Sequence, residues 1–176
     1  SGHASHQSGL DVDLWYTYPA QAARRALTRK EREQLPAHAI VDLKTKKATE
    51  HFTPRITAIL KLTARDRRVA RIFVHPIIKQ TLCTNVRGKR AWLRKLRPWY
   101  GHHDHFHVRL HCPDDSPDCQ SQSSVGNGDG CDELDWWLSE DKQAARAKGR
   151  KSYRKRIRSV PRLPEQCSGL LDAPTR

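Results

Sequence analysis

The chain has 176 residues, of which 36% are hydrophobic and 30% charged, enough for one globular domain with a hydrophobic core. No stretch approaches eighteen apolar residues, which excludes a transmembrane helix, and no signal peptide is visible. The net charge of +14 favours contact with a polyanion such as nucleic acid, anionic lipid or a cell-wall polymer.

The first half of the sequence predicts a strand, short helical segments and one amphipathic helix. Residues 9–18 alternate in polarity, which predicts a strand with one face in the core. The alternating residues are Leu10, Val12, Leu14 and Tyr16 on one side and Asp11, Asp13 and Trp15 on the other. We expect residues 20–34 to be partly helical and residues 38–45 to form a short strand. Pro54 suits the first turn of a helix that places Ile56, Ile59, Leu60 and Leu62 on one side.

The second half predicts two further strands. Residues 69–74 are typical of a buried strand, residues 76–83 and 89–96 of short helices, and residues 97–104 of a loop. Residues 105–110 alternate again, with Phe106, Val108 and Leu110 against His105, His107 and Arg109. Residues 112–131 are irregular, and Asp132 is a plausible N-cap of a short helix over 132–140. Strands and helices mix without regular βαβ alternation, so we predict an α+β fold with a small antiparallel sheet flanked by short helices.

The positive charge is concentrated at the C-terminal end. Residues 141–176 contain eleven Lys or Arg and three Asp or Glu, and the run from Lys142 to Arg158 has nine basic residues and no acidic one. Charge alone carries no specificity, so this segment could bind an anionic polymer or membrane surface, or be a solvated tail. We predict a folded domain over residues 1–140 and a basic tail over residues 141–176.

Five cysteines lie at positions 83, 112, 119, 131 and 167, and none form a C-x-x-C pair. This spacing disfavours a cysteine-based zinc site. Cys112 and Cys119 bracket a polar, turn-rich loop that one bridge could close. The region is typical of disulfide-stapled loops and so of an oxidising compartment.

The strand over residues 105–110 places two histidines side by side. Because its apolar face is buried, its polar face is fixed too, and His105 and His107 point into the same space. One imidazole can bind a metal while the other transfers protons, since neutral imidazole is a zinc ligand and titrates near working pH.

A second stretch can complete a metal site. His6 precedes the first strand, Gly9 lets the loop turn back, and Asp13 lies on the polar face of that strand. Together with His107 they give two histidines and one aspartate with an open fourth position, the pattern of catalytic zinc sites. Such a zinc ion (Zn2+) lowers the pKa of its bound water to roughly 7. Two alternatives remain open: Asp11 can replace Asp13, and His103 with His105 forms a competing H-x-H pair.

Four motifs together resemble the penicillin-insensitive murein endopeptidase family, bacterial cell-wall metallopeptidases of the lysostaphin and D-Ala-D-Ala metallopeptidase group. The motifs are GHASHQSGLDVDLW, RIFVHPIIKQTLC, WLRKLRPWYGHHDHFHVRLHCP and GDGC followed by ELDWW. They occur in the family's order over most of residues 2–140. The chain lacks the segment that precedes the first motif, so we expect it to begin inside a longer precursor.

The resemblance implies a role for each matched residue. His6, Asp13 and His107 match the zinc ligands, and His3 matches a further histidine near the metal. His105 and His102 match functional histidines and are implied to be catalytic. The implied disulfides join Cys83 to Cys131 and Cys112 to Cys119, with Cys167 paired to a cysteine that this chain lacks. Residues 42–47 do not show the Asp and His of some members, so we do not expect a second metal.

The resemblance also implies a reaction, the zinc-dependent hydrolysis of D-alanyl-meso-diaminopimelyl cross-links of peptidoglycan in the periplasm. Without an H-E-x-x-H motif, His102 and His105 must share the base, acid and oxyanion roles. Trp99 and Tyr100 are candidates for lining the substrate groove. Arg109 is a candidate for binding a substrate carboxylate, with a buried ion pair as the alternative.

Two other classes of protein remain as hypotheses. The charge and the histidines permit a basic nucleic-acid-binding protein or a metal-dependent nuclease, although no RNP, zinc-finger or helix-turn-helix signature supports it. A zinc-stabilised, non-catalytic wall-binding module is the third possibility.

Overall fold

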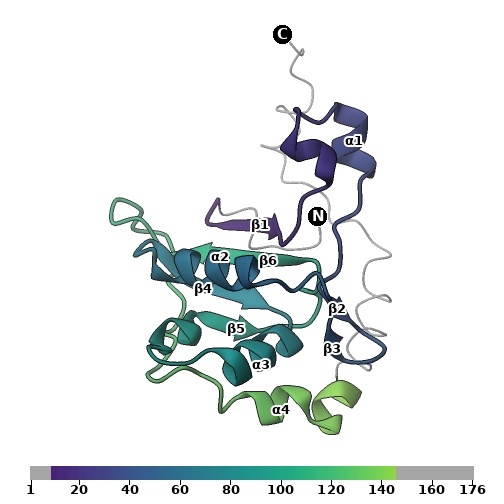
Figure 1. Cartoon of the computed structure of the whole chain (residues 1–176). Helices are drawn as coiled ribbons and strands as arrows, with labels where there is room; N and C mark the ends of the chain where they lie inside the picture. Colours follow the sequence, from purple (N-terminus) through teal and green to yellow (C-terminus); the bar gives the residue numbers. More distant parts are fainter. Residues whose placement is uncertain (1–8, 146–176) are drawn as a thin grey trace. The chain divides into compact units, whose positions relative to one another are not determined.

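The computed structural model describes residues 9–145 of the chain (Figure 1). They fall into two compact units that divide between Trp137 and Leu138, and all of the elements below except the last residue of α4 belong to the first unit. The predictions for His3, His6, Cys167 and the basic tail lie outside the described residues. Among residues 9–145 there is no helix with the length and apolar character needed to cross a membrane.

A four-stranded sheet forms the centre of the first unit, with strand order β1-β6-β4-β5 (Figure 1). The strands are β1 (Asp11–Trp15), β4 (Val69–Val74), β5 (Leu96–Pro98) and β6 (His105–Leu110). β6 pairs antiparallel with both β1 and β4, as predicted. β5 lies in the region predicted as helix and loop and runs parallel to β4, so the sheet is mixed rather than purely antiparallel. Its three residues are too few to show a periodicity, and the helical segments between β4 and β5 return the chain in the parallel direction.

The helices surround this sheet and confirm the α+β class. They are η2 (Ala20–Ala23), α1 (Arg29–Gln34), α2 (Pro54–Arg65), α3 (Pro76–Asn85), η3 (Ala91–Lys95) and α4 (Leu134–Leu138). β2 (Val41–Asp42) and β3 (Lys47–Ala48) form a separate small hairpin. α4 begins at Leu134, so the prediction of Asp132 as its N-cap is wrong by one position. Glu133, which precedes the helix, pairs with Arg97 instead.

α2 packs against β4 through residues spaced four apart. Ile56, Leu60 and Ala64 are buried there, which confirms the predicted amphipathic helix. Leu62 is 75% exposed, so its predicted place on the buried side is wrong. It lies two positions after Leu60, about 200° around the helix, and therefore points to the opposite side.

β1 differs most from its prediction. Val12 is 46% exposed and Leu14 is also exposed, whereas the Asp11 side chain is only 1% exposed. The predicted burial of the apolar face is therefore wrong for these two residues. β1 is an edge strand, and the helix α2 packs against β4, two strands away, so it does not cover the apolar face of β1.

Both implied disulfides are present, joining Cys83 to Cys131 and Cys112 to Cys119. The first bridge ties α3 to the turn before α4. The buried Lys79 holds the same turn, because its Nζ donates to the carbonyl oxygen of Asp129 at 2.7 Å, and a second bond from Nζ to the carbonyl oxygen of Leu93 at 2.5 Å ties α3 to η3. The turn that precedes α4 is thus fixed by a covalent bond and by a hydrogen bond from a buried lysine.

We predict unequal effects from removing the two bridges. Replacing Cys83 and Cys131 with alanine should lower the free energy of unfolding by about 4 kcal/mol, because that bridge closes a span of 48 residues. The matched Cys112→Ala, Cys119→Ala variant loses a bridge across only 7 residues and should lose about 2 kcal/mol. Urea unfolding of both variants measures the difference, and equal losses would contradict the prediction.

Candidate metal centre and active site

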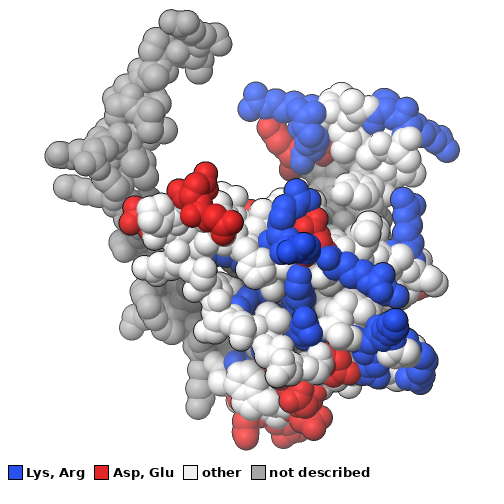
Figure 2. All heavy atoms as spheres, turned by 90° about the vertical axis from the view of Figure 1, so that its left-hand side faces the viewer, with Lys and Arg blue, Asp and Glu red and all other residues white. Residues whose placement is uncertain are grey.

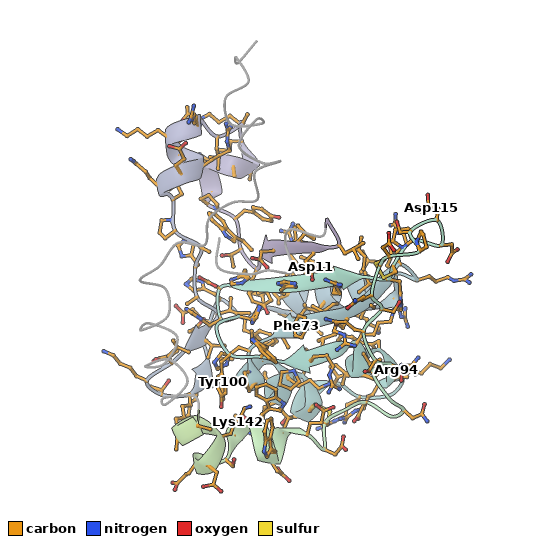
Figure 3. All side chains as sticks on the ribbon, turned by 180° about the vertical axis from the view of Figure 1, so that it is seen from behind. Asp11, Phe73, Arg94, Tyr100, Asp115 and Lys142 are labelled. Carbon is orange, nitrogen blue, oxygen red and sulfur yellow. A yellow bond between two sulfur atoms is a disulfide. The ribbon has the colours of Figure 1, made fainter. Side chains whose placement is uncertain are left out.

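The polar face of the sheet brings the residues of two strands together. Because β1 and β6 are antiparallel, Asp13 lies opposite His107 and Asp11 lies opposite Arg109. On the other side of β6, Phe73 of β4 is the partner of His107. Figure 3 labels Asp11 and Phe73 over this sheet. Strand alternation therefore gathers two carboxylates and two histidines on one face, as the sequence predicted.

His107 lies between the two aspartates. Its Nε2 atom is 2.7 Å from Asp11 Oδ1, and its Nδ1 atom is 3.1 Å from Asp13 Oδ1. Two ligands of one tetrahedral zinc ion, each bonded at about 2.0–2.2 Å, are separated by about 3.3–3.5 Å, slightly more than the distance between Asp13 Oδ1 and His107 Nδ1. Asp13 and His107 Nδ1 therefore have the donor chemistry and the spacing that a shared metal needs.

Asp11 is buried and bonded on both sides. One oxygen contacts His107 and the other forms an ion pair with Arg109. Asp13 is 39% exposed and so is open to an ion from solvent. This difference favours Asp13 over Asp11 as the metal ligand. Arg109 forms the buried ion pair named as its alternative, and its contact with a substrate carboxylate stays a prediction.

His105 is more exposed than His107 and is held by a different carboxylate. Its Nδ1 atom is 2.6 Å from Asp104 Oδ1, and its Nε2 atom is 3.9 Å from Asp13 Oδ1. Because Asp104 engages Nδ1, the Nε2 atom faces the Asp13 side of the site. The alternative H-x-H pair of His103 with His105 stays a prediction.

His102 lies in the loop before β6 and is brought against both histidines of the strand. Its ring centre is 5.0 Å from that of His105 and 6.0 Å from that of His107. Its Nδ1 atom is 3.1 Å from the carbonyl oxygen of Trp99, to which it can donate. Burial lowers the pKa of His102 to about 4, so its imidazole is neutral at neutral pH.

The two predicted aromatic residues have different environments. Trp99 is 52% exposed and its ring centre is 5.8 Å from that of Phe73, which lies 5.3 Å from that of His107. The Tyr100 hydroxyl donates to the carbonyl oxygen of Trp137. Phe73 is a site residue that sequence reasoning missed. Its alternation with the buried Ile72 and Val74 was the available signal.

Within residues 9–145 no three metal-ligating side chains form a group, and the predicted ligands His3 and His6 lie outside this range. The described part of the site therefore provides two donors, Asp13 and His107. Both fit zinc, since an imidazole nitrogen and a carboxylate oxygen are two of its preferred ligands in proteins.

The fold and the site together define a small α+β domain with a cluster of histidines and aspartates on one face of its sheet. The chain belongs to peptidase family M74, described as penicillin-insensitive murein endopeptidase, whose family model matches residues 1–172. This membership confirms the resemblance on which the roles of the site residues rest.

Curated proteins from several bacteria are similar to nearly the whole chain. The proteins from Pectobacterium atrosepticum and Yersinia enterocolitica are each 41% identical over 177 residues, covering 98% of this chain. The protein from Escherichia coli O157:H7 is 40% identical over 176 residues and covers 97%. All three are named penicillin-insensitive murein endopeptidase. The chain spans 58–59% of their lengths.

Proposed function

We propose that the protein is a zinc metallo-endopeptidase that hydrolyses the D-alanyl-meso-diaminopimelyl cross-links of peptidoglycan in the periplasm. The observation that carries the proposal is the 3.1 Å separation of Asp13 Oδ1 and His107 Nδ1, with His102 and His105 in ring contact beside them. The names of the relatives supply the substrate. The two disulfides support the compartment, because such bonds persist in an oxidising environment.

His6, Asp13 and His107 would hold the metal, with His3 as a further candidate. When bound, zinc lowers the pKa of a water molecule and polarises the carbonyl of the scissile amide. Asp11 orients the imidazole ring of His107 through its contact with Nε2. Because it is the closer carboxylate and is buried, it holds the His107 proton on Nε2, which leaves the lone pair of Nδ1 directed to the Asp13 side.

His105 is the residue that moves protons in this proposal. Asp104 holds its Nδ1 atom, so Nε2 takes a proton from the attacking water and returns it to the amine that leaves. His102 stays neutral, with its Nδ1 proton directed to Trp99, and acts through Nε2. The Asp104 carboxylate, which contacts Nδ1 of His105, also stabilises the imidazolium that forms during the proton transfer.

The direct test is digestion of purified cross-linked muropeptides. We expect dimers to become monomers, a chelator to stop the reaction, and added zinc to restore it. Chromatography of the products measures the conversion. Cleavage that continues in the presence of the chelator would contradict metal dependence. Cleavage of DNA without cleavage of muropeptides would instead favour the nuclease hypothesis, and retained zinc without any cleavage would favour a wall-binding module.

A further inference from the structure

A line of aromatic rings, which we call the aromatic row, leads from the candidate site to the protein surface. Its members are Phe73, Trp99, Trp137 and Trp136. Phe73 contacts His107, Trp99 contacts Phe73, and the ring centres of Trp99 and Trp137 are 5.7 Å apart. The row ends at Trp136, whose ring centre is 5.1 Å from that of Trp137. The row therefore joins β4, the residue directly after β5, and α4 through side chains.

Two members of the aromatic row present their rings to solvent. Trp99 is 52% exposed and Trp136 is 57% exposed. Leaving so much apolar surface in water is unfavourable. Large apolar side chains that are exposed together beside a polar site are typical of a binding surface.

The aromatic row is held in place by contacts at its base. Tyr100 packs against Trp137 with ring centres 5.7 Å apart and donates to its carbonyl oxygen. Arg97 of β5 pairs with Glu133 directly before α4, with Nη2 2.6 Å from Oε2. The Cys83–Cys131 bridge fixes the same segment. Because α4 is tied to β5 in these ways, the rings are ordered before any ligand arrives.

The charge around the aromatic row identifies the chemistry of its ligand. Residues 128–137 include four acidic residues and no Lys or Arg, and two of the four, Asp129 and Glu133, form ion pairs with Arg90 and Arg97. Figure 2 shows acidic side chains gathered at the lower end of the molecule, the level at which Figure 1 draws α4. Proteins that stack nucleic-acid bases on aromatic rings surround them with basic residues, and anionic lipid surfaces require the same. An uncharged ligand with flat apolar faces fits this surface instead.

We propose that Trp99 and Trp136 form a stacking platform for the sugar rings of the peptidoglycan glycan strand. This inference rests on the proposed function, since it names a second part of the same substrate. One face of a pyranose ring carries C–H groups that pack on an indole, while its hydroxyl groups stay hydrated. The platform would hold the strand beside the site while its peptide reaches His105 and His107.

The test compares two soluble substrates in steady-state kinetics, cross-linked peptide dimers without sugar and the same dimers carrying disaccharides. We expect the wild type to have a lower KM for the sugar-bearing dimer. Trp136→Ala should raise that KM about tenfold, to the value for the sugar-free dimer, with kcat and sugar-free cleavage unchanged. Trp136→Phe should recover part of the difference. The control is Tyr18→Ala, which removes an exposed aromatic residue outside the aromatic row and should change neither KM.

A binding measurement separates this inference from the proposed function. Titration of the protein with uncharged glycan strands made of N-acetylglucosamine alone, followed by tryptophan fluorescence, should show binding that Trp136→Ala abolishes. If the wild type binds the strands but cleaves no dimer, the platform stands and the proposed function fails. If both dimers are cleaved with equal KM and the strands do not bind, the platform is wrong and the proposed function stands.

Discussion

Replacing His105 with alanine is expected to abolish cleavage of muropeptide cross-links while leaving zinc bound. His105 lies beside Asp13 and His107, the two proposed metal donors, and its own Nδ1 atom is engaged by Asp104. Loss of the proton-transferring group should lower kcat by about 10²–10⁴-fold. The measurements are the rate of dimer cleavage and the zinc content of the purified variant by elemental analysis.

Alanine variants of two other histidines serve as comparisons for His105→Ala. His107→Ala should lose both zinc and activity, because it removes a donor rather than a proton carrier. His111→Ala removes an exposed histidine of the same run and should change neither. If His105→Ala lost zinc to the same extent as His107→Ala, or cleaved at the wild-type rate, its assigned role would be wrong.

Asp11→Asn is expected to destabilise the protein strongly and to weaken zinc binding. The Asp11 carboxylate is buried against both His107 and Arg109, so its neutralisation removes the negative charge from a buried ion pair. Breaking a buried ion pair from one side costs about 3–5 kcal/mol. Loss of the carboxylate that orients a metal-binding histidine lowers metal affinity by about 10–100-fold. Urea unfolding of the zinc-free protein and competition with a chelating dye measure the two effects separately.

Asp13→Asn is the matched control for this experiment. Asp13 is 39% exposed, so its replacement should hardly change the unfolding of the zinc-free protein. It should nevertheless lose zinc, because a direct donor is removed. Equal stability of the two zinc-free variants would show that Asp11 does not have the structural role assigned to it here.

Local periodicity was sufficient to predict the elements whose faces are clearly separated. α2, β4 and β6 were predicted correctly because regular spacing marks one buried side, and the face of β6 then followed from alternation. β1 has the same alternation, yet its apolar side chains Val12 and Leu14 are exposed. The alternation of polarity along one strand does not show whether a helix covers its apolar face. The position of the strand in the sheet decides whether that face is buried.

The candidate site was predictable only in part, for a similar reason. The cluster of histidines near β6 and the pairing of Asp13 with His107 followed from strand geometry and from the family resemblance. The contact between His102 and His105 depends on the path of the loop before β6. The contacts of Trp99 with Phe73 and with Trp137 depend on packing between segments far apart in the sequence, which no short pattern contains.

The position of β1 at the edge of the sheet has a thermodynamic consequence. Asp13 and His107 are cross-strand partners, so an ion that both bind would join the edge strand to its neighbour. Metal occupancy and the attachment of β1 to the sheet are then linked equilibria, in which each favours the other by the same free energy. Zinc in this protein would therefore have a structural role, linking two strands, as well as a catalytic one. Amide hydrogen exchange along β1 would slow as the ion binds.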